Sequence, residues 1–113
     1  MAGPVLQINH LKVAPEDQDA LVRLMTEQLD ANIATRPGFL SATLHRSRDG
    51  RHVVNVVRFA SAEQLDAAHA RPEFAAKLRE YRPLILEAGP ALYDVAAHRC
   101  APDGPPATAE PAP

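Results

Sequence analysis

The chain has 113 residues, of which 46% are hydrophobic, 12 are basic and 14 are acidic, so its formal net charge is −2. This length supports one domain with a real core but not two, and without long runs of one charge the chain lacks the surface that nucleic acid or an anionic membrane would bind. Its apolar runs are shorter than the ~20 residues that cross a bilayer, and its single Cys100 can form no internal disulfide, so we expect a cytoplasmic protein whose partners are small molecules or other proteins.

The N-terminal part of the chain predicts a strand followed by a helix. The run VLQINHLKV, residues 5–13, is apolar and partly alternating, as in a β-strand. A helix begins near Pro15, because proline fixes φ for the first helical turn and the acids that follow it suit the positive end of the helix dipole. The helix ends before Pro37-Gly38. Its buried stripe is spaced by three and four residues: Leu21 or Val22, Met25, Leu29 and Ile33.

A β-hairpin is expected next, from strands at residues 39–47 and 51–59 joined through Asp49-Gly50, a strong turn signal. Side chains alternate along the second strand: Val53, Asn55, Val57 and Phe59 share one face, and His52, Val54, Val56 and Arg58 share the other. A two-residue turn pairs Leu44 with Asn55 and sends His45 to the opposite face. A register shifted by one residue places His45 beside Asn55, and the sequence leaves both registers open.

The C-terminal half predicts an interrupted helix, a final strand and a tail. Ser61 and Gln64 form a capping box for a helical region that breaks near Arg71 and restarts at Pro72. The side of this second helix that faces the core is formed by Phe74, Leu78 and Tyr81. Pro83 and Gly89-Pro90 break the chain before a strand at residues 91–98. Residues 101–113 lack side chains that could anchor them in a core and predict a disordered tail, so the domain is assigned to residues 1–100.

These elements give the order β-α-β-β-α-β, the ferredoxin-like arrangement of the α+β class, in which an antiparallel sheet carries helices on one face. The other face has no helices, and its candidate residues include Leu6, Ile8, Val54 and Val56. Large apolar patches rarely stay exposed on a monomer. We therefore expect a homodimer packed sheet against sheet, and the alternative is a monomer with an unusually apolar face.

Asn55 is the strand residue that most needs an explanation, because it stands among Val53, Val54, Val56 and Val57. A polar side chain left unpaired in an apolar environment costs roughly 1–3 kcal/mol. If the helices cover its face, Asn55 lies between sheet and helices, where small-ligand cavities form and a few polar groups orient the ligand. The alternative is a structural role, in which the amide bonds a helix end or a strand backbone.

The run PGFLSATLHRSRDG, followed by VVN, Phe59 and the helix-capping Ser61, resembles the antibiotic biosynthesis monooxygenase domain, especially the small enzymes that oxidise aromatic polyketides. The resemblance covers roughly residues 5–98. It implies a dimeric α+β barrel of antibiotic or secondary-metabolite biosynthesis. It also implies oxidation of a phenolic anthrone or naphthacenone to a quinone by O2, without metal or flavin. The sequence is consistent with this, since it shows neither metal-ligand spacing nor a glycine-rich nucleotide motif.

The resemblance also implies roles for individual residues. Asn55, His45 and Arg79 match polar pocket residues of the polyketide-oxidising members. The match implies that Asn55 donates to an oxyanion, that His45 acts as the base and that Arg79 stabilises the anionic substrate. Phe59 stands where these enzymes typically carry Trp, and it keeps an aromatic wall for the substrate without the hydrogen-bond donor. Leu65 stands where some members have a pocket Tyr, so the proton relay of that phenol is missing.

The sequence leaves two other functions open for this fold. Haem degradation in the same fold uses an Asn on the first strand, which Asn9 matches, but the helix positions for the haem-ligating His and for a Trp hold Leu78 and Ala68. A non-catalytic dimeric module that binds a small aromatic molecule is favoured by the changes at Phe59 and Leu65. The remaining histidines show no ligand spacing and are expected to be structural or surface residues: His10, His52, His69 and His98.

Overall fold

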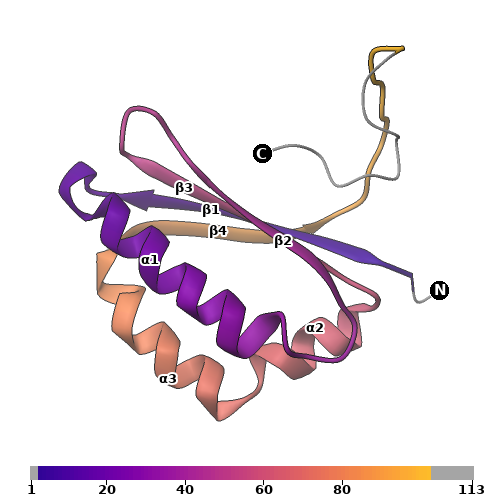
Figure 1. The fold of residues 1–113 in the computed structure, drawn as a ribbon, viewed down its shortest axis with the longest axis horizontal. Helices are drawn as coiled ribbons and strands as arrows, with labels where there is room; N and C mark the ends of the chain where they lie inside the picture. The colour runs from indigo at the N-terminus through magenta and orange to yellow at the C-terminus, as the bar shows by residue number, and fades with distance from the viewer. Residues whose placement is uncertain (1–2, 103–113) are drawn as a thin grey trace.

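The computed structural model describes residues 3–102, and Figure 1 shows their arrangement. The strands and longer helices are β1 (Val5–Val13), α1 (Gln18–Gln28), β2 (Phe39–Arg46), β3 (His52–Phe59), α2 (Ala62–His69), α3 (Pro72–Tyr81) and β4 (Ile85–Tyr93). Short helical segments lie at Pro15–Asp17, Leu29–Ile33 and Arg82–Leu84. The predicted order is confirmed, and the second helical region divides at Arg71-Pro72 as expected.

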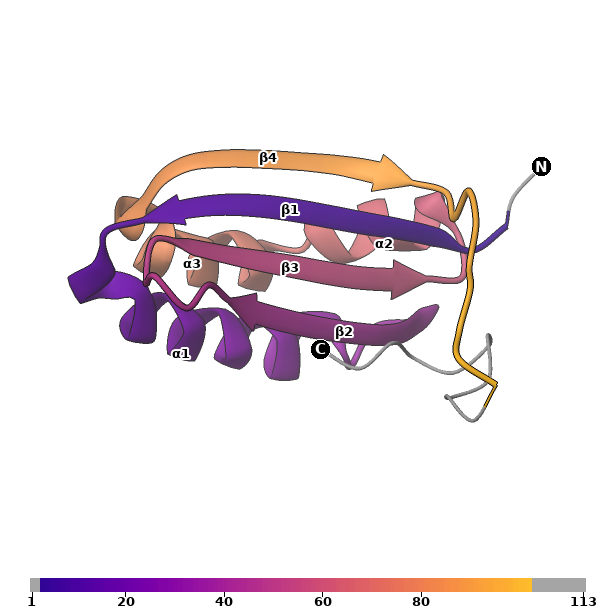
Figure 2. The ribbon, with the colours of Figure 1, turned by 90° about the horizontal axis from the view of Figure 1, so that it is seen from above.

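The four strands form one antiparallel sheet in the order β2-β3-β1-β4. All three longer helices lie on one side of the sheet, which we call the inner face (Figures 1 and 2). The strand β4 occupies the edge that is farthest from β2 and α1 (Figure 2). This arrangement confirms the predicted ferredoxin-like α+β fold, and the side of the sheet without helices is called the outer face below.

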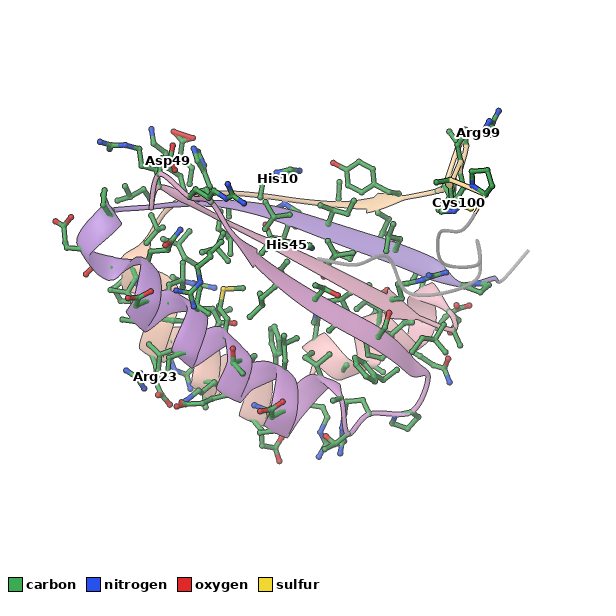
Figure 3. All side chains as sticks on the ribbon, turned by 45° about the horizontal axis from the view of Figure 1, so that its top comes forward. His10, Arg23, His45, Asp49, Arg99 and Cys100 are labelled. Atoms are coloured by element: carbon green, nitrogen blue, oxygen red, sulfur yellow. The ribbon has the colours of Figure 1, made fainter. Side chains whose placement is uncertain are left out.

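The hairpin adopts the register in which His45 and Asn55 lie on opposite faces of the sheet. Leu44 lies opposite Asn55, and His45 lies opposite Val54. The same Val54 pairs with His10 on its other side, so both histidines lie in one row across the outer face. Figure 3 shows His45 and His10 on the side of the sheet away from α1.

The hairpin turn explains why this register is adopted. Backbone N–H of Ser47 donates to the carbonyl of His52 over 3.0 Å and closes a loop longer than two residues. Gly50 has φ of +81°, in the left-handed region that glycine enters without steric cost. Inside the loop, the Asp49 carboxylate accepts from Ser47 Oγ and from the Arg51 backbone N–H. These bonds hold the pKa of Asp49 below its usual value, with the Ser47 hydroxyl as the main cause.

The final strand differs from the sequence prediction, because β4 spans Ile85–Tyr93 rather than residues 91–98. Gly89 and Pro90 lie inside the strand, where they pair with His10 and Asn9 of β1. An edge strand tolerates proline, since the N–H that proline lacks is needed on only one side. The expectation that Gly89-Pro90 breaks the chain before the strand is therefore wrong.

The first helical region ends in a π-helical turn, which is wider than an α-helical turn. Residues Leu29–Ile33 form a π-helical turn, in which Ala34 N–H donates to the Leu29 carbonyl over 2.7 Å. The following Gly38 has φ of +87°, and a Cβ at this position would lie 2.3 Å from Gln64 Oε1. Glycine is therefore required here both by the backbone conformation and by the packing of α2. The helix ends before Pro37-Gly38, as predicted.

The core fills the space between the helices and the inner face of the sheet. Leu21, Met25 and Ile33 of the predicted stripe are buried, and so are Val53, Val57 and Phe59 of β3. Ser61 caps α2 by accepting from the Gln64 backbone N–H over 3.2 Å. The predicted alternation of β3 is confirmed, and it places Asn55 on the inner face between two buried valines.

In the described part of the chain, every helix is too short or too polar to cross a membrane. The tail predicted at residues 101–113 lies outside the described residues, except for 101 and 102. The domain limits, the cytoplasmic location and the homodimer stay predictions.

Candidate active site

A cavity of about 550 Å³ lies between the inner face of the sheet and the helices. Its floor comes from β1 and β3, and its roof comes from α1, the π-helical turn Leu29–Ile33 and α3. The side toward the sheet edge is formed by β4, whose residues from 86 to 93 are all exposed. The volume and the largely apolar walls are typical of a site for a small organic molecule.

Two asparagines lie next to each other on the cavity floor. Asn9 of β1 and Asn55 of β3 are directly paired across the sheet, and both line the cavity. The Oδ1 atoms of both side chains are buried and have no hydrogen-bond partner among the described residues. A half turn about χ2 lets each amide offer either its NH₂ group or its oxygen to a bound molecule.

An unpaired buried carbonyl costs about 1–3 kcal/mol, so two of them side by side need a compensating partner. A structural role for Asn55, in which its amide bonds a helix end or a strand backbone, is not supported by the geometry, since its Oδ1 bonds no described residue. The pair Asn9–Asn55 is therefore the feature of the floor that a polar ligand atom would complete.

A buried hydrogen-bond network forms part of the roof. Gln28 Nε2 donates to the Phe74 carbonyl over 3.0 Å and to the Tyr81 hydroxyl over 3.2 Å. Gln28 Oε1 accepts from Asn32 Nδ2 over 2.7 Å. Burial raises the pKa of Tyr81, so its hydroxyl keeps its proton. Gln28 and Tyr81 both line the cavity, and the network fixes α1 against α3 around it.

His69, the last residue of α2, also lines the cavity. Its imidazole packs on the Phe74 ring, with 4.8 Å between the ring centroids. Burial lowers the pKa of His69 below its ordinary value, and the nearby Asp66 carboxylate acts against this shift. His69, which the sequence predicts to be a structural or surface residue, thus lies against the cavity.

Charged residues reach the cavity only where it is exposed. Arg82 and Glu87 line it, and both are exposed to solvent. Arg79 is also exposed but does not line the cavity. Arg82, three residues after Arg79, is therefore the arginine that lines the cavity in the described part of the chain.

The other predicted site residues have different positions. His45 lies on the outer face beside Val54, so within this chain it does not meet Asn55. Phe59 and Leu65 are 0% and 2% exposed and belong to the core outside the cavity lining. Leu78 does line the cavity, but its side chain has no atom that could ligate a haem iron.

The functional candidates that the sequence interpretation missed are Gln28, His69, Tyr81 and Arg82. One signal was available, because Gln28 lies three residues after Met25 and therefore on the buried side of the helix. A second was that His69 follows Leu65 by one helical turn. The approach of α2 and α3 to the same cavity depends on how the two helices cross the sheet, which no local pattern records.

Comparisons with known proteins show to which family the chain is similar. The family model described as "Antibiotic biosynthesis monooxygenase" matches residues 4–80. Tetracenomycin-F1 monooxygenase from Streptomyces glaucescens is 42% identical over 65 residues, which are 58% of this chain and 58% of that enzyme. The matched segment thus spans little more than half of the enzyme's length.

Solved structures share the fold over most of the chain. SnoaB from Streptomyces nogalater, described as a cofactor-independent oxygenase, has a TM-score of 0.68 and 25% identity, and the match covers 90% of this chain and 100% of SnoaB. Rv0793 from Mycobacterium tuberculosis has a TM-score of 0.71 and 20% identity over 86% of this chain and 99% of its own. The second likeness shows the fold alone.

Proposed function

The chain belongs to the antibiotic biosynthesis monooxygenase family, and we propose that it is a monooxygenase that oxidises an aromatic polyketide to a quinone with O2. We take the substrate to be a phenol of the anthrone or naphthacenone type, and the reaction to need no cofactor. The similarity to tetracenomycin-F1 monooxygenase and to SnoaB supports this assignment.

The observation that carries the proposal is the Asn9–Asn55 pair on the floor of an apolar cavity of about 550 Å³. A flat polycyclic phenol would fill the apolar walls, and its oxygen atoms would meet the two unpaired amides. In the deprotonated substrate the oxygen carries negative charge, which the NH₂ groups of Asn9 and Asn55 stabilise as donors. Arg82 at the exposed side adds a positive charge near the same anion.

The chemistry uses the substrate as its own electron donor. Loss of a proton gives a carbanion that is conjugated with the phenol, and this carbanion passes an electron to O2. The two resulting radicals combine to a peroxide, which loses water to form the quinone. The protein contributes the cavity, the amide donors and the exclusion of bulk water.

We further propose that two copies of the chain pack through the outer faces of their sheets. Leu6, Ile8, Val54 and Val56 lie on this face, and none of the helices covers it. Exposed Tyr93 and Val95 extend the apolar surface. The area without helices is the reason for preferring a dimer over a monomer.

The proposal is tested by O2 uptake of the purified protein with a panel of anthrones and naphthacenones, without added cofactor. Wild-type protein should consume O2 and form the quinone, while Asn55→Ala should be about 10²- to 10³-fold slower, the usual effect of removing an oxyanion donor. Circular dichroism should show an unchanged fold, because the variant removes a side chain that bonds no described residue.

The control is Asn55→Asp, which keeps the shape of the side chain but replaces the NH₂ donor by an anion. It should be at least as slow as Asn55→Ala if donation to an oxyanion is the role. Wild-type rates in both variants would contradict that role. If a coloured aromatic compound binds and no member of the panel reacts, the non-catalytic binding module is the better description.

A further inference from the structure

We propose that His69 is the general base that removes the proton from the aromatic substrate, an inference that rests on the proposed function. The family resemblance implies this task for His45, but His45 lies on the outer face, where it cannot reach a molecule that contacts Asn55 of the same chain. His69 is the histidine that lines the cavity in the described part of the chain. The base therefore comes from the end of α2.

The position of His69 suits this role in three ways. It lines the same cavity as Asn9 and Asn55, so one bound molecule can contact the base and the amide donors together. Its ring is held by packing on Phe74. Neither ring nitrogen is bonded to another side chain among the described residues, so a ring nitrogen is free to accept a proton from a ligand.

The surroundings keep the imidazole neutral and ready to accept a proton. Burial lowers the pKa of His69, and Asp66 on the same helix is the group that acts in the other direction. From the other elements around the cavity, Tyr81 stays protonated, while Arg82 and Glu87 lie at its exposed side. A neutral imidazole whose pKa lies below 6.5 is unprotonated at neutral pH.

A nitrogen of neutral His69 forms a bond to a proton of the substrate CH₂ group, and the electron pair of the C–H bond stays on the substrate. The carbanion reacts with O2, and the imidazolium returns the proton to the peroxide anion. In the second half His69 removes the remaining C–H proton while the O–O bond breaks, and hydroxide takes that proton from the imidazolium to leave as water. Histidine is regenerated, O2 is reduced and the carbon is oxidised to a carbonyl.

The test separates proton removal from oxidation by excluding O2. A dihydroxyanthrone is titrated anaerobically into the full-length protein, and its deprotonation is followed as a shift of its visible absorption to longer wavelength. Wild-type protein and His52→Gln, a control at an exposed histidine outside the cavity, should both give the shift. His69→Gln keeps a polar side chain of similar size, and it should bind the anthrone, as measured by equilibrium dialysis, without the shift.

Kinetics in air give a second readout. His69→Ala should lower kcat by about 10²- to 10⁴-fold, the usual contribution of a general base, and added imidazole should restore part of the rate. Wild-type activity should fall as the pH falls through the lowered pKa of His69, because the protonated ring cannot accept a proton. The residual activity of His69→Gln should not show this decrease at low pH.

Four results would overturn the assignment of His69 as the base. An equal absorbance shift in wild type and His69→Gln shows that another group removes the proton, and normal turnover of His69→Gln in air shows the same while the proposed function stands. Loss of activity in His45→Ala with none in His69→Gln would move the base to the outer face. If wild-type protein neither binds nor oxidises the anthrones, the proposed function fails, and the base assignment fails with it.

Discussion

Residues of the same type lie in different surroundings in this chain because of the face on which each is placed. His45 and His69 have the same side chain, but β2 sends the first to the outer face and α2 brings the second to the cavity. Asn9 and Asn55 combine into one pair because β1 and β3 are neighbours in register. The chemistry of a residue is therefore set by the position of its backbone at least as much as by its side chain.

Phe59 was expected to stack against the substrate, but it is fully buried and its ring meets Phe39 edge to face, with 5.9 Å between centroids. We expect Phe59→Leu to lower the free energy of unfolding by about 1–3 kcal/mol, because it leaves a void in the core. Substrate binding should be unchanged. Urea unfolding and equilibrium dialysis measure the two quantities.

The matched variant is Phe74→Leu, which changes the aromatic ring that lines the cavity and packs on His69. It should weaken substrate binding more than Phe59→Leu does. The opposite order would show that Phe59 contacts the substrate as the resemblance implied.

At the scale of elements, side-chain contacts join α1 to α3, the two helices that form the roof of the cavity. Gln28 of α1 bonds the Phe74 carbonyl and the Tyr81 hydroxyl of α3, and Lys77 of α3 pairs with Glu27 of α1. This ion pair lowers the pKa of Glu27 and raises that of Lys77, chiefly through their mutual hydrogen bond. The ion pair is exposed to water on the Glu27 side, so the buried amide is the stronger link.

We expect Gln28→Ala to lower the free energy of unfolding by about 1–3 kcal/mol, since it removes the hydrogen bonds of Gln28 to the Phe74 carbonyl, the Tyr81 hydroxyl and the Asn32 amide. The control is Arg23→Ala on the same helix. It breaks only an exposed pair with Glu27 and should cost about 0.3–0.5 kcal/mol. Equal urea midpoints for the two variants would contradict a structural role for Gln28.

At the scale of the whole molecule, one side of the sheet is covered by helices and the other is not (Figure 2). The strand β4 is exposed on both faces, and Leu86, Leu92 and Tyr93 are among its exposed residues. Because β4 also forms one side of the cavity, a partner that covers this strand would also limit access to the site.

The proposed dimer predicts that a charge at the centre of the outer face separates the subunits. Val56→Glu should convert a dimer to a monomer in sedimentation velocity, because the carboxylate would lose its hydration when it is buried against the partner's sheet. Ala76→Glu, at an exposed position of α3, is the control and should remain dimeric. A wild-type protein that is monomeric at all concentrations would exclude this interface.

Local patterns determined most of the fold. The element order was predicted by prolines and glycines at the ends of the elements and by the capping box at Ser61. The inner face was predicted by the alternation of side chains along β3. These signals act within a few residues. The same alternation identified Asn55 as a polar residue on that face. The edge strand β4 was misplaced, since only its position at the sheet edge makes Gly89-Pro90 tolerable inside a strand.

Asn55 was therefore recognisable from the sequence alone, because a polar amide among the valines of a buried strand needs a hydrogen-bond partner. Its pairing with Asn9, the place of His69 in the cavity and the exclusion of His45 from it were decided only by the tertiary structure. The physical reason is that strand register and helix crossing bring together residues 46 to 60 positions apart, and contacts at that separation leave no periodic trace in a sequence.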